Sequence, residues 1–218
     1  MSDAAIRLAD VRSRIARAAR AARRDPKDVT LVAVTKQRGQ ADIGPLIAAG
    51  VTDFGENRVA EVKEKWPSLR ADHPELRIHM IGQLQSNKAG EAVTLFDVIH
   101  SLDRPSLLDA LVREGEKAGR FPEVFVQVNI GAEEQKGGVS IEELPQLLAA
   151  VRASPLPLVG LMAMPPNGLE SGPYFALLAE LARRHDVTGL SMGMSSDYPT
   201  AVMLGATTVR IGSALFED

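Results

Sequence analysis

The sequence predicts a single (β/α)8 barrel, also called a TIM barrel, preceded by one extra N-terminal helix. Short apolar runs alternate with helical patterns along all 218 residues, and this alternation implies parallel strands joined by right-handed crossovers. Eight such units in a chain of about 200–250 residues favour a closed barrel. The alternative is an open doubly wound sheet, but no G-x-G-x-x-G motif follows the first strand.

Each strand is expected where a short apolar run is bounded by polar or turn-forming residues. The eight expected strands are Thr30–Thr35, Asp53–Phe54, Arg77–Ile81, Phe96–His100, Glu123–Asn129, Leu156–Met162, Gly189–Ser191 and Thr208–Ile211. Helical patterns between them cover Ala41–Ala49, Arg58–Arg70, Arg104–Lys117, Ile141–Ala153, Gly172–His185 and Tyr198–Leu204. Because no linker or charge block divides the chain, residues 1–218 are expected to form one domain.

The first expected helix precedes the first strand. Leu8, Val11, Ile15, Ala18 and Ala22 follow a helical stripe there, which favours an amphipathic helix over a transit peptide. We expect this helix to cover the barrel position that a helix after strand eight normally fills.

Composition excludes several classes of function. The chain has no cysteine, which rules out disulfides, cysteine nucleophiles and thiolate metal sites. A formal net charge of −3 gives no reason to expect binding to nucleic acid or to an anionic membrane. No apolar run reaches the roughly 18 residues that span a bilayer, and the N-terminus lacks the apolar core of a signal peptide. We therefore expect a cytoplasmic protein.

Barrel active sites lie at the C-terminal ends of the strands, and this rule places Lys36 at the mouth of the barrel. The apolar run Leu-Val-Ala-Val precedes Lys36 by one residue. An amine that is partly withdrawn from water beside a cation such as Arg210 is favoured in the neutral form that attacks an aldehyde. The alternative is a solvated lysine in the first loop residue after a strand.

Two loops rich in small residues follow strands seven and eight, where barrels commonly bind phosphate. Ser195 offers a hydroxyl beside Gly193, just before a short helix that starts near Asp197, and free N–H groups at a helix start bind phosphate oxygens. Gly212 allows a ligand to approach the backbone, and Ser213 supplies a second hydroxyl. The alternative is that these are small residues in tight turns.

Other polar residues near the mouth have ordinary structural explanations. Asn57 follows strand two, where it could contact a ligand or cap the next helix. His79 is expected in a layer of the barrel. Glu56, Asp103 and Asp197 are candidates for proton chemistry, although solvated loop acids are commoner. The four histidines show no metal-ligand spacing, so no metal is expected.

Seven segments spread along the chain carry a family resemblance. They are LVAVTK, DFGENRVAE, IHMIGQLQSNK, IHSLD, VNIGAEEQKGGV, GLMAMPP and LSMGMSSDYPTAVMLGATTVRIGSALF. In this order they resemble the YggS/PROSC family of pyridoxal phosphate homeostasis proteins, which is similar in fold to the N-terminal barrel of alanine racemase. The resemblance covers about Ile15 to Phe216, which is nearly the whole chain.

The resemblance implies pyridoxal 5′-phosphate (PLP) as the cofactor. Lys36 resembles the lysine that holds PLP as a Schiff base, and Arg210 resembles the arginine that faces the pyridine nitrogen. An arginine remains protonated and can only donate. The ring nitrogen would then accept a hydrogen bond and stay unprotonated, which makes the ring a weaker electron sink than one paired with a carboxylate.

The same resemblance implies the remaining cofactor contacts. Ser195, Gly212 and Ser213 resemble the phosphate ligands of the family. Met194 lies next to the first of these serines, and we expect it to add a backbone contact. Asn57 resembles the pocket asparagine near the cofactor.

The resemblance implies a protein of PLP homeostasis that holds PLP and delivers it to apoenzymes. Its expected partners are PLP, apo PLP enzymes and free amino acids, and its expected state is a monomer or a weak dimer. Alanine racemases add a tyrosine base from a second domain, which this chain is expected to lack; Tyr174 and Tyr198 lie in helical patterns. The alternatives are a PLP-dependent amino-acid racemase or lyase with Lys36 as its only base, and a PLP-free barrel aldolase or phosphosugar isomerase.

Overall fold

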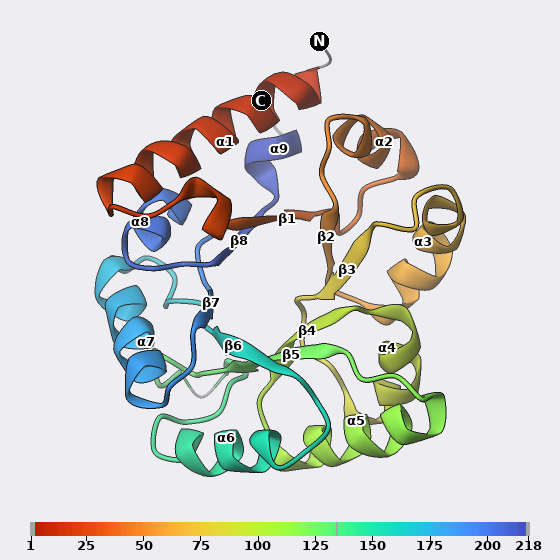
Figure 1. The fold of residues 1–218 in the computed structure, drawn as a ribbon, viewed down its shortest axis with the longest axis vertical. Coiled ribbons are helices and arrows are strands. Elements are labelled where there is room, and N and C mark those ends of the chain that lie inside the picture. Colours follow the sequence, from red (N-terminus) through yellow and green to blue (C-terminus); the bar gives the residue numbers. More distant parts are fainter. Residues whose placement is uncertain (1–2, 134, 217–218) are drawn as a thin grey trace.

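Eight parallel strands form a closed barrel in the computed structural model, which describes residues 3–133 and 135–216 (Figure 1). Neighbouring strands pair in chain order, and β8 closes the ring on β1. The strands are β1 (Thr30–Val34), β2 (Asp53–Glu56), β3 (Arg77–Met80), β4 (Val98–Leu102), β5 (Glu123–Gln127), β6 (Leu158–Met162), β7 (Gly189–Ser191) and β8 (Thr208–Ile211). The predicted (β/α)8 barrel is confirmed, and each strand lies within a few residues of its expected place.

Helices surround the ring of strands (Figure 1). They are α1 (Asp3–Ala21), α2 (Gln40–Ala48), α3 (Val59–Asp72), α4 (Ala89–Leu95), α5 (Pro105–Ala118), α6 (Leu144–Arg152), α7 (Gly172–Arg184), α8 (Tyr198–Met203) and α9 (Ser213–Phe216), with the 3-10 turns η1 (Pro26–Asp28) and η2 (Ser86–Lys88). Their buried faces pack against the outside of the strands and form the main hydrophobic core.

Two helices were not foreseen, the short α9 after the last strand and α4, and α4 changes the start of a strand. Helix α4 has the sequence AGEAVTL, in which small residues leave only a weak apolar stripe. Phe96 follows α4 as its C-cap and is fully buried. Strand β4 therefore begins at Val98, two residues after the expected position.

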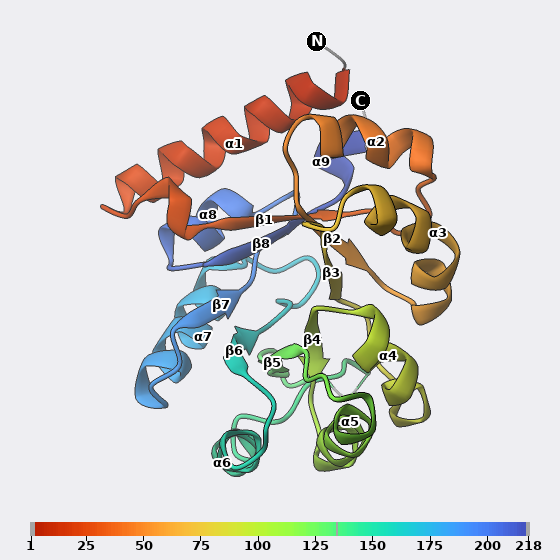
Figure 2. The same ribbon diagram turned by 45° about the vertical axis from the view of Figure 1, so that its right-hand side comes forward.

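Helix α1 closes the outer layer. It packs against α2, α8 and α9 and covers the edge where β1 meets β8 (Figures 1 and 2). Leu8, Val11 and Ile15 are buried in this contact, and each buried aliphatic side chain of this size contributes about 1.5–3 kcal/mol. The N-terminal helix thus takes the place expected for it after strand eight.

Side chains fill the inside of the barrel. Val98, Phe125 and Met162 form an apolar cluster that is separate from the main core. A polar contact lies beside it, where His100 Nδ1 is 2.8 Å from Ser191 Oγ. Since β4 and β7 are not neighbours, this contact crosses the interior. The barrel is a packed core, so ligand chemistry is confined to its rim.

Across the described part of the chain, no helix has the length and apolar character needed to cross a membrane.

Candidate functional site

A pocket of about 510 Å³ opens at the C-terminal ends of the strands. Parallel pairing of β1 with both β2 and β8 brings the loops after these three strands to one edge. All seven residues that the sequence analysis assigned to cofactor binding line this pocket: Lys36, Asn57, Met194, Ser195, Arg210, Gly212 and Ser213. Val34, Ile81, Gly82, Gln83, Gln127, Met164 and Ser196 complete its lining.

Lys36 is the second residue after β1, and its side chain is exposed. Its ammonium forms no hydrogen bond or ion pair with the described residues. The partial burial expected for this amine is therefore not seen in the ligand-free protein. Thr35, one residue earlier, is fully buried, so the chain passes from core to solvent within a single peptide unit and leaves the Lys36 amine free to react.

The turn that carries Lys36 is held from behind by α3. Lys65 Nζ donates to the backbone oxygen of Thr35 at 2.9 Å, and the backbone N–H of Gln37 donates to Glu61 Oε2 at 3.1 Å. Gln37 has a φ of 60°, a left-handed conformation that costs energy in a residue other than glycine. These two contacts, one on each side of Lys36, fix the direction in which the lysine leaves the barrel.

We call the contacts that hold this turn from α3 the brace, and Glu56 anchors it. The structure corrects the sequence-based expectation for Glu56. It was expected as a solvated loop acid, but it ends β2, is fully buried and does not line the pocket. Its Oε1 lies 2.7 Å from Lys65 Nζ and accepts hydrogen bonds from Thr35 Oγ1 at 2.7 Å and Trp66 Nε1 at 3.1 Å. Burial raises the pKa of the Glu56 carboxyl, although Lys65 and Thr35 oppose the shift.

The segment after β8 forms a cup of backbone donors around a side chain from the loop after β7. The N–H groups of Gly212 and Ala214 both donate to Ser195 Oγ, at 3.2 and 3.3 Å. One oxygen atom thus already sits where two amides converge, as a phosphate oxygen would. Gly193 shapes the cup with a φ of 95°, and a Cβ at this position would lie 2.6 Å from the Cβ of Ala201.

Arg210 lies on β8 beneath the mouth, with only 5% of its surface exposed. Its Nη1 donates to Ser191 Oγ at 2.5 Å, and its Nη2 donates to the backbone oxygen of Ala163 at 3.2 Å. Burial lowers the pKa of Arg210 to about 10, partly offset by Asp197. The guanidinium therefore stays protonated at neutral pH and can only donate hydrogen bonds to a ligand.

Asn57 does not cap the helix that follows it. Helix α3 has Arg58 as its N-cap, and no hydrogen bond joins the Asn57 carboxamide to the described residues. The loop after β3 presses against Asn57, because a Cβ on Gly82 would lie 2.4 Å from the Asn57 backbone oxygen. The capping alternative is thus excluded, and the carboxamide is available at the pocket wall.

Comparison with known proteins identifies the family. The family model for the alanine racemase N-terminal domain matches residues 6–218. A pyridoxal phosphate homeostasis protein of Pseudomonas aeruginosa is 43% identical over 223 residues, covering 99% of this chain and 96% of the relative. The chain belongs to the pyridoxal phosphate homeostasis protein family. A Synechocystis member of this family is 40% identical over 206 residues, covering 88% of this chain and 93% of the relative.

A solved structure supports this family assignment. PipY of Synechococcus elongatus PCC7942, solved with PLP bound, superposes with a TM-score of 0.82 and is 39% identical. The match covers 98% of this chain and 99% of PipY.

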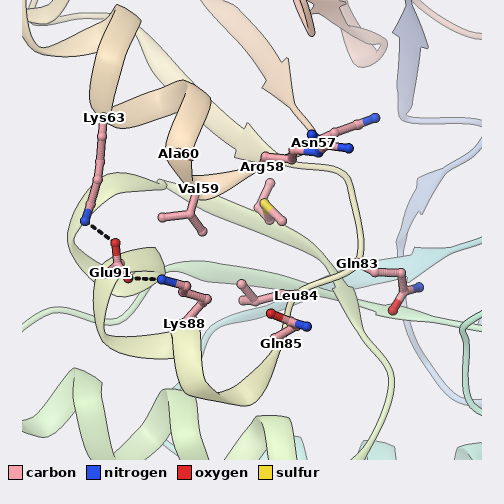
Figure 3. Close-up of a pocket in the computed structure, with 11 residues that line it drawn as sticks. Asn57, Arg58, Val59, Ala60, Lys63, Gln83, Leu84, Gln85, Lys88 and Glu91 are labelled. Carbon is pink, nitrogen blue, oxygen red and sulfur yellow. Dashed lines mark hydrogen bonds and ion pairs between the residues drawn. The ribbon is translucent and has the colours of Figure 1, made fainter.

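A smaller hollow adjoins the mouth pocket in this member of the family. It has a volume of about 360 Å³ and shares Asn57 and Gln83 with the mouth. Figure 3 shows Lys63 and Lys88 reaching Glu91 at its far side, and both form ion pairs with that carboxylate. Lys63 and Lys88 are therefore partly neutralised, unlike Lys36, whose amine forms no ion pair with the described residues.

No group of three or more metal-ligating His, Cys, Asp or Glu side chains occurs among residues 3–133 and 135–216. The two buried histidines, His79 and His100, contact each other inside the barrel. His79 lies within the barrel as expected, and His100, which the sequence did not single out, stacks on Phe125 with ring centroids 4.5 Å apart. Their signal in the sequence is the matched position in two successive strands, RIHM and VIHS.

Proposed function

We propose that this chain binds PLP as a Schiff base on Lys36 and serves PLP homeostasis by holding the cofactor and delivering it to apoenzymes. The observation that carries the proposal is one pocket that combines an unpaired amine, a buried guanidinium and a cup of backbone donors. The names of the relatives and the PLP bound to PipY support the same cofactor.

The residues of the pocket fit the chemistry of PLP. PLP supplies an aldehyde that condenses with a primary amine, with loss of one water. Lys36 offers that amine, and the hydroxyls of Ser195 and Ser213 offer donors for the phosphate. A phosphate oxygen would replace Ser195 Oγ as the acceptor of the Gly212 and Ala214 amides. Arg210 would donate to the ring nitrogen, with Asn57 and Met194 beside the cofactor. The same pocket thus has a partner for each polar end of the molecule.

The ionisable groups in the pocket favour a protein that holds PLP over an enzyme that turns over an amino-acid substrate. Lys36 and Arg210 are the ionisable side chains in its described lining, and Arg210 only donates. Tyr174 and Tyr198 do not line the pocket, and Tyr198 is buried under α1. Racemisation of an amino acid needs proton transfer on both faces of the substrate, and the described lining supplies one base.

Release is proposed to occur by attack of a second amine on the bond to Lys36. The exposed position of Lys36 lets a free amino acid or the lysine of an apoenzyme reach it. The protein is further proposed to act in the cytoplasm as a monomer or a weak dimer. In support, the large exposed apolar side chains in the described residues are few: Ile6, Leu169, Leu177 and Met203.

Borohydride reduction followed by peptide mass mapping tests the proposal. We expect a phosphopyridoxyl adduct on Lys36, and none on Lys63, Lys65 or Lys88. The Lys36→Ala variant should lose the yellow colour, whereas Lys27→Ala, a change on the opposite face of the barrel, should keep it. Recovery of activity by an apoenzyme mixed with the loaded protein measures delivery.

Two results would contradict the proposal. Colourless protein that fails to bind added PLP would favour a PLP-free barrel enzyme. Sustained turnover of an amino acid, lost in Lys36→Ala, would favour a PLP-dependent racemase or lyase.

A further inference from the structure

A chain of hydrogen bonds crosses the barrel from Arg210 to the opposite end. Arg210 Nη1 contacts Ser191 Oγ at 2.5 Å, and Ser191 Oγ contacts His100 Nδ1 at 2.8 Å. His100 Nε2 lies 2.9 Å from His79 Nδ1, and His79 Nε2 lies 3.0 Å from Asp53 Oδ1. The residues come from β8, β7, β4, β3 and β2. Asp53 begins β2, so the chain runs from the mouth to the N-terminal end of the barrel.

Asp53 is ionised at the far end of this chain. Burial opposes ionisation, but hydrogen bonds from His79 and Thr52 outweigh it and hold the pKa of Asp53 below its usual value. The guanidinium of Arg210 forms no ion pair with any carboxylate in the described residues. The two opposite charges therefore lie at the two ends of one hydrogen-bonded chain across the barrel interior.

The two ends fix the direction of the outer hydrogen bonds, and the directions of the inner ones follow from neutral histidines. Arg210 can only donate, and the Asp53 carboxylate can only accept. His79 must then donate from Nε2 and, when neutral, accept at Nδ1, which requires His100 to donate from Nε2.

His100 is held neutral, because burial, reinforced by the cations Arg210 and Arg77, takes its pKa well below the usual value. Its Nδ1 is left to accept from the hydroxyl of Ser191. All four hydrogen bonds then point the same way, and such aligned chains polarise one another.

We define the relay as Ser191, His100, His79 and Asp53. We propose that the relay is a positioning device that holds Arg210 as a fixed hydrogen-bond donor toward the ring nitrogen of PLP and keeps that nitrogen unprotonated. This inference rests on the proposed function. None of the relay residues lines the pocket, so each acts through Arg210.

The first test needs no cofactor. In ligand-free protein labelled with ¹⁵N-histidine, long-range ¹⁵N–¹H spectra should show His100 as a neutral ring protonated at Nε2, with that proton donated to His79 Nδ1, from pH 6 to pH 8. A proton on Nδ1 of His100, or titration of His100 in this range, would overturn the relay. Because PLP is absent, this result is independent of whether the proposed function is right.

The second test uses loaded protein and three variants. Ser191→Ala cuts the relay beside Arg210, and Asp53→Asn keeps an accepting oxygen but removes the far charge. Ser101→Ala is the matched control, because Ser101 is also a buried serine on a barrel strand and its hydroxyl has no partner in the described residues.

The readouts are the ¹⁵N shift of labelled pyridine nitrogen and the absorption spectrum. We expect Ser191→Ala, and to a smaller extent Asp53→Asn, to increase ring-nitrogen protonation at pH 6. PLP affinity in Ser191→Ala should fall about tenfold, the effect of one charge-assisted hydrogen bond. Ser101→Ala should match the wild type.

Unchanged nitrogen shifts in both relay variants would overturn the inference while leaving PLP binding intact. If Ser191→Ala does not fold, Asp53→Asn and the histidine spectra still decide the question. Borohydride mapping to Lys36 in every folded variant separates the relay from the Schiff-base site. Loss of PLP from the wild type would instead contradict the proposed function.

Discussion

Removing the ammonium of Lys65 should destabilise the protein and loosen the turn that carries Lys36. Lys65→Met keeps most of the side chain but leaves Glu56 without its cation, 2.7 Å away in the present structure. Breaking a buried ion pair by deleting one partner costs about 3–5 kcal/mol. Because Lys65 is 12% exposed and Glu56 is fully buried, water reaches only one side of the pair. We expect a loss of about 3 kcal/mol in the free energy of unfolding.

A double-mutant cycle measured by urea denaturation at pH 7 tests this figure. In Glu56→Gln the amide oxygen can still accept from Thr35 and Trp66, and Lys65 keeps a carboxylate partner in Glu61, 3.5 Å away. In the double variant neither charge of the buried pair remains. The double variant should therefore be more stable than the sum of the two single losses, by at least about 1 kcal/mol. Lys88→Met, which removes one of two cations from the half-buried Glu91, is the control and should change stability little.

The pH dependence supplies an independent check. Burial raises the pKa of Glu56 and Lys65 opposes that shift, so Lys65→Met lets the pKa rise further. A carboxyl whose folded pKa lies above its unfolded value binds more protons in the native state, and stability then falls as pH rises through that interval. The loss in Lys65→Met should accordingly shrink between pH 7 and pH 5. Additive losses that do not change with pH would refute the reasoning. PLP affinity should also fall in Lys65→Met and not in Lys88→Met.

Three further predictions follow from single contacts. Asp53 has a lowered pKa, so its contribution to stability is present above the ordinary carboxyl range and is lost on acidification; Asp53→Asn should lose less stability than the wild type between about pH 5 and pH 3 in urea titrations. Gly193→Ala combines a φ of 95° with a contact of 2.6 Å, and thermal unfolding should show a loss of about 2–4 kcal/mol. In Gly212→Ala the added Cβ would meet Val34 no closer than 3.6 Å, so melting should change little, while calorimetry should show weaker PLP binding because the phosphate approaches that backbone.

The sequence was sufficient for the barrel because each strand is a local signal. Runs such as Leu-Val-Ala-Val at β1 and Phe-Val-Gln-Val at β5 stand out from polar flanks, and eight of them leave few topologies. Helix α4 escaped because its small residues carry little periodicity. Its presence was decided by packing around Phe96 and not by local preference.

The mouth residues were also predictable, since the end of a strand fixes which residues reach the rim of a barrel. The brace and the relay were not, because both depend on side-chain contacts between different elements of the fold. Glu56 meets Lys65 across a strand–helix connection, and His100 meets Ser191 across 91 positions. No feature of the neighbouring sequence shows whether Glu56 is buried or solvated. Only the packing of α3 against β2 brings the ammonium of Lys65 to its carboxylate.

The position of α1 has a consequence for how the protein is made. This helix leaves the ribosome before the other described elements, yet two of the helices that cover its apolar face, α8 and α9, are synthesised after the rest of the barrel. Until then Leu8, Val11 and Ile15 lack part of their final environment, and β1 waits for β8 as its second neighbour. Contacts of such long sequence separation form slowly, and exposed apolar surface favours aggregation in the interval. The nascent chain is thus most vulnerable between emergence of its first helix and completion of its last strand.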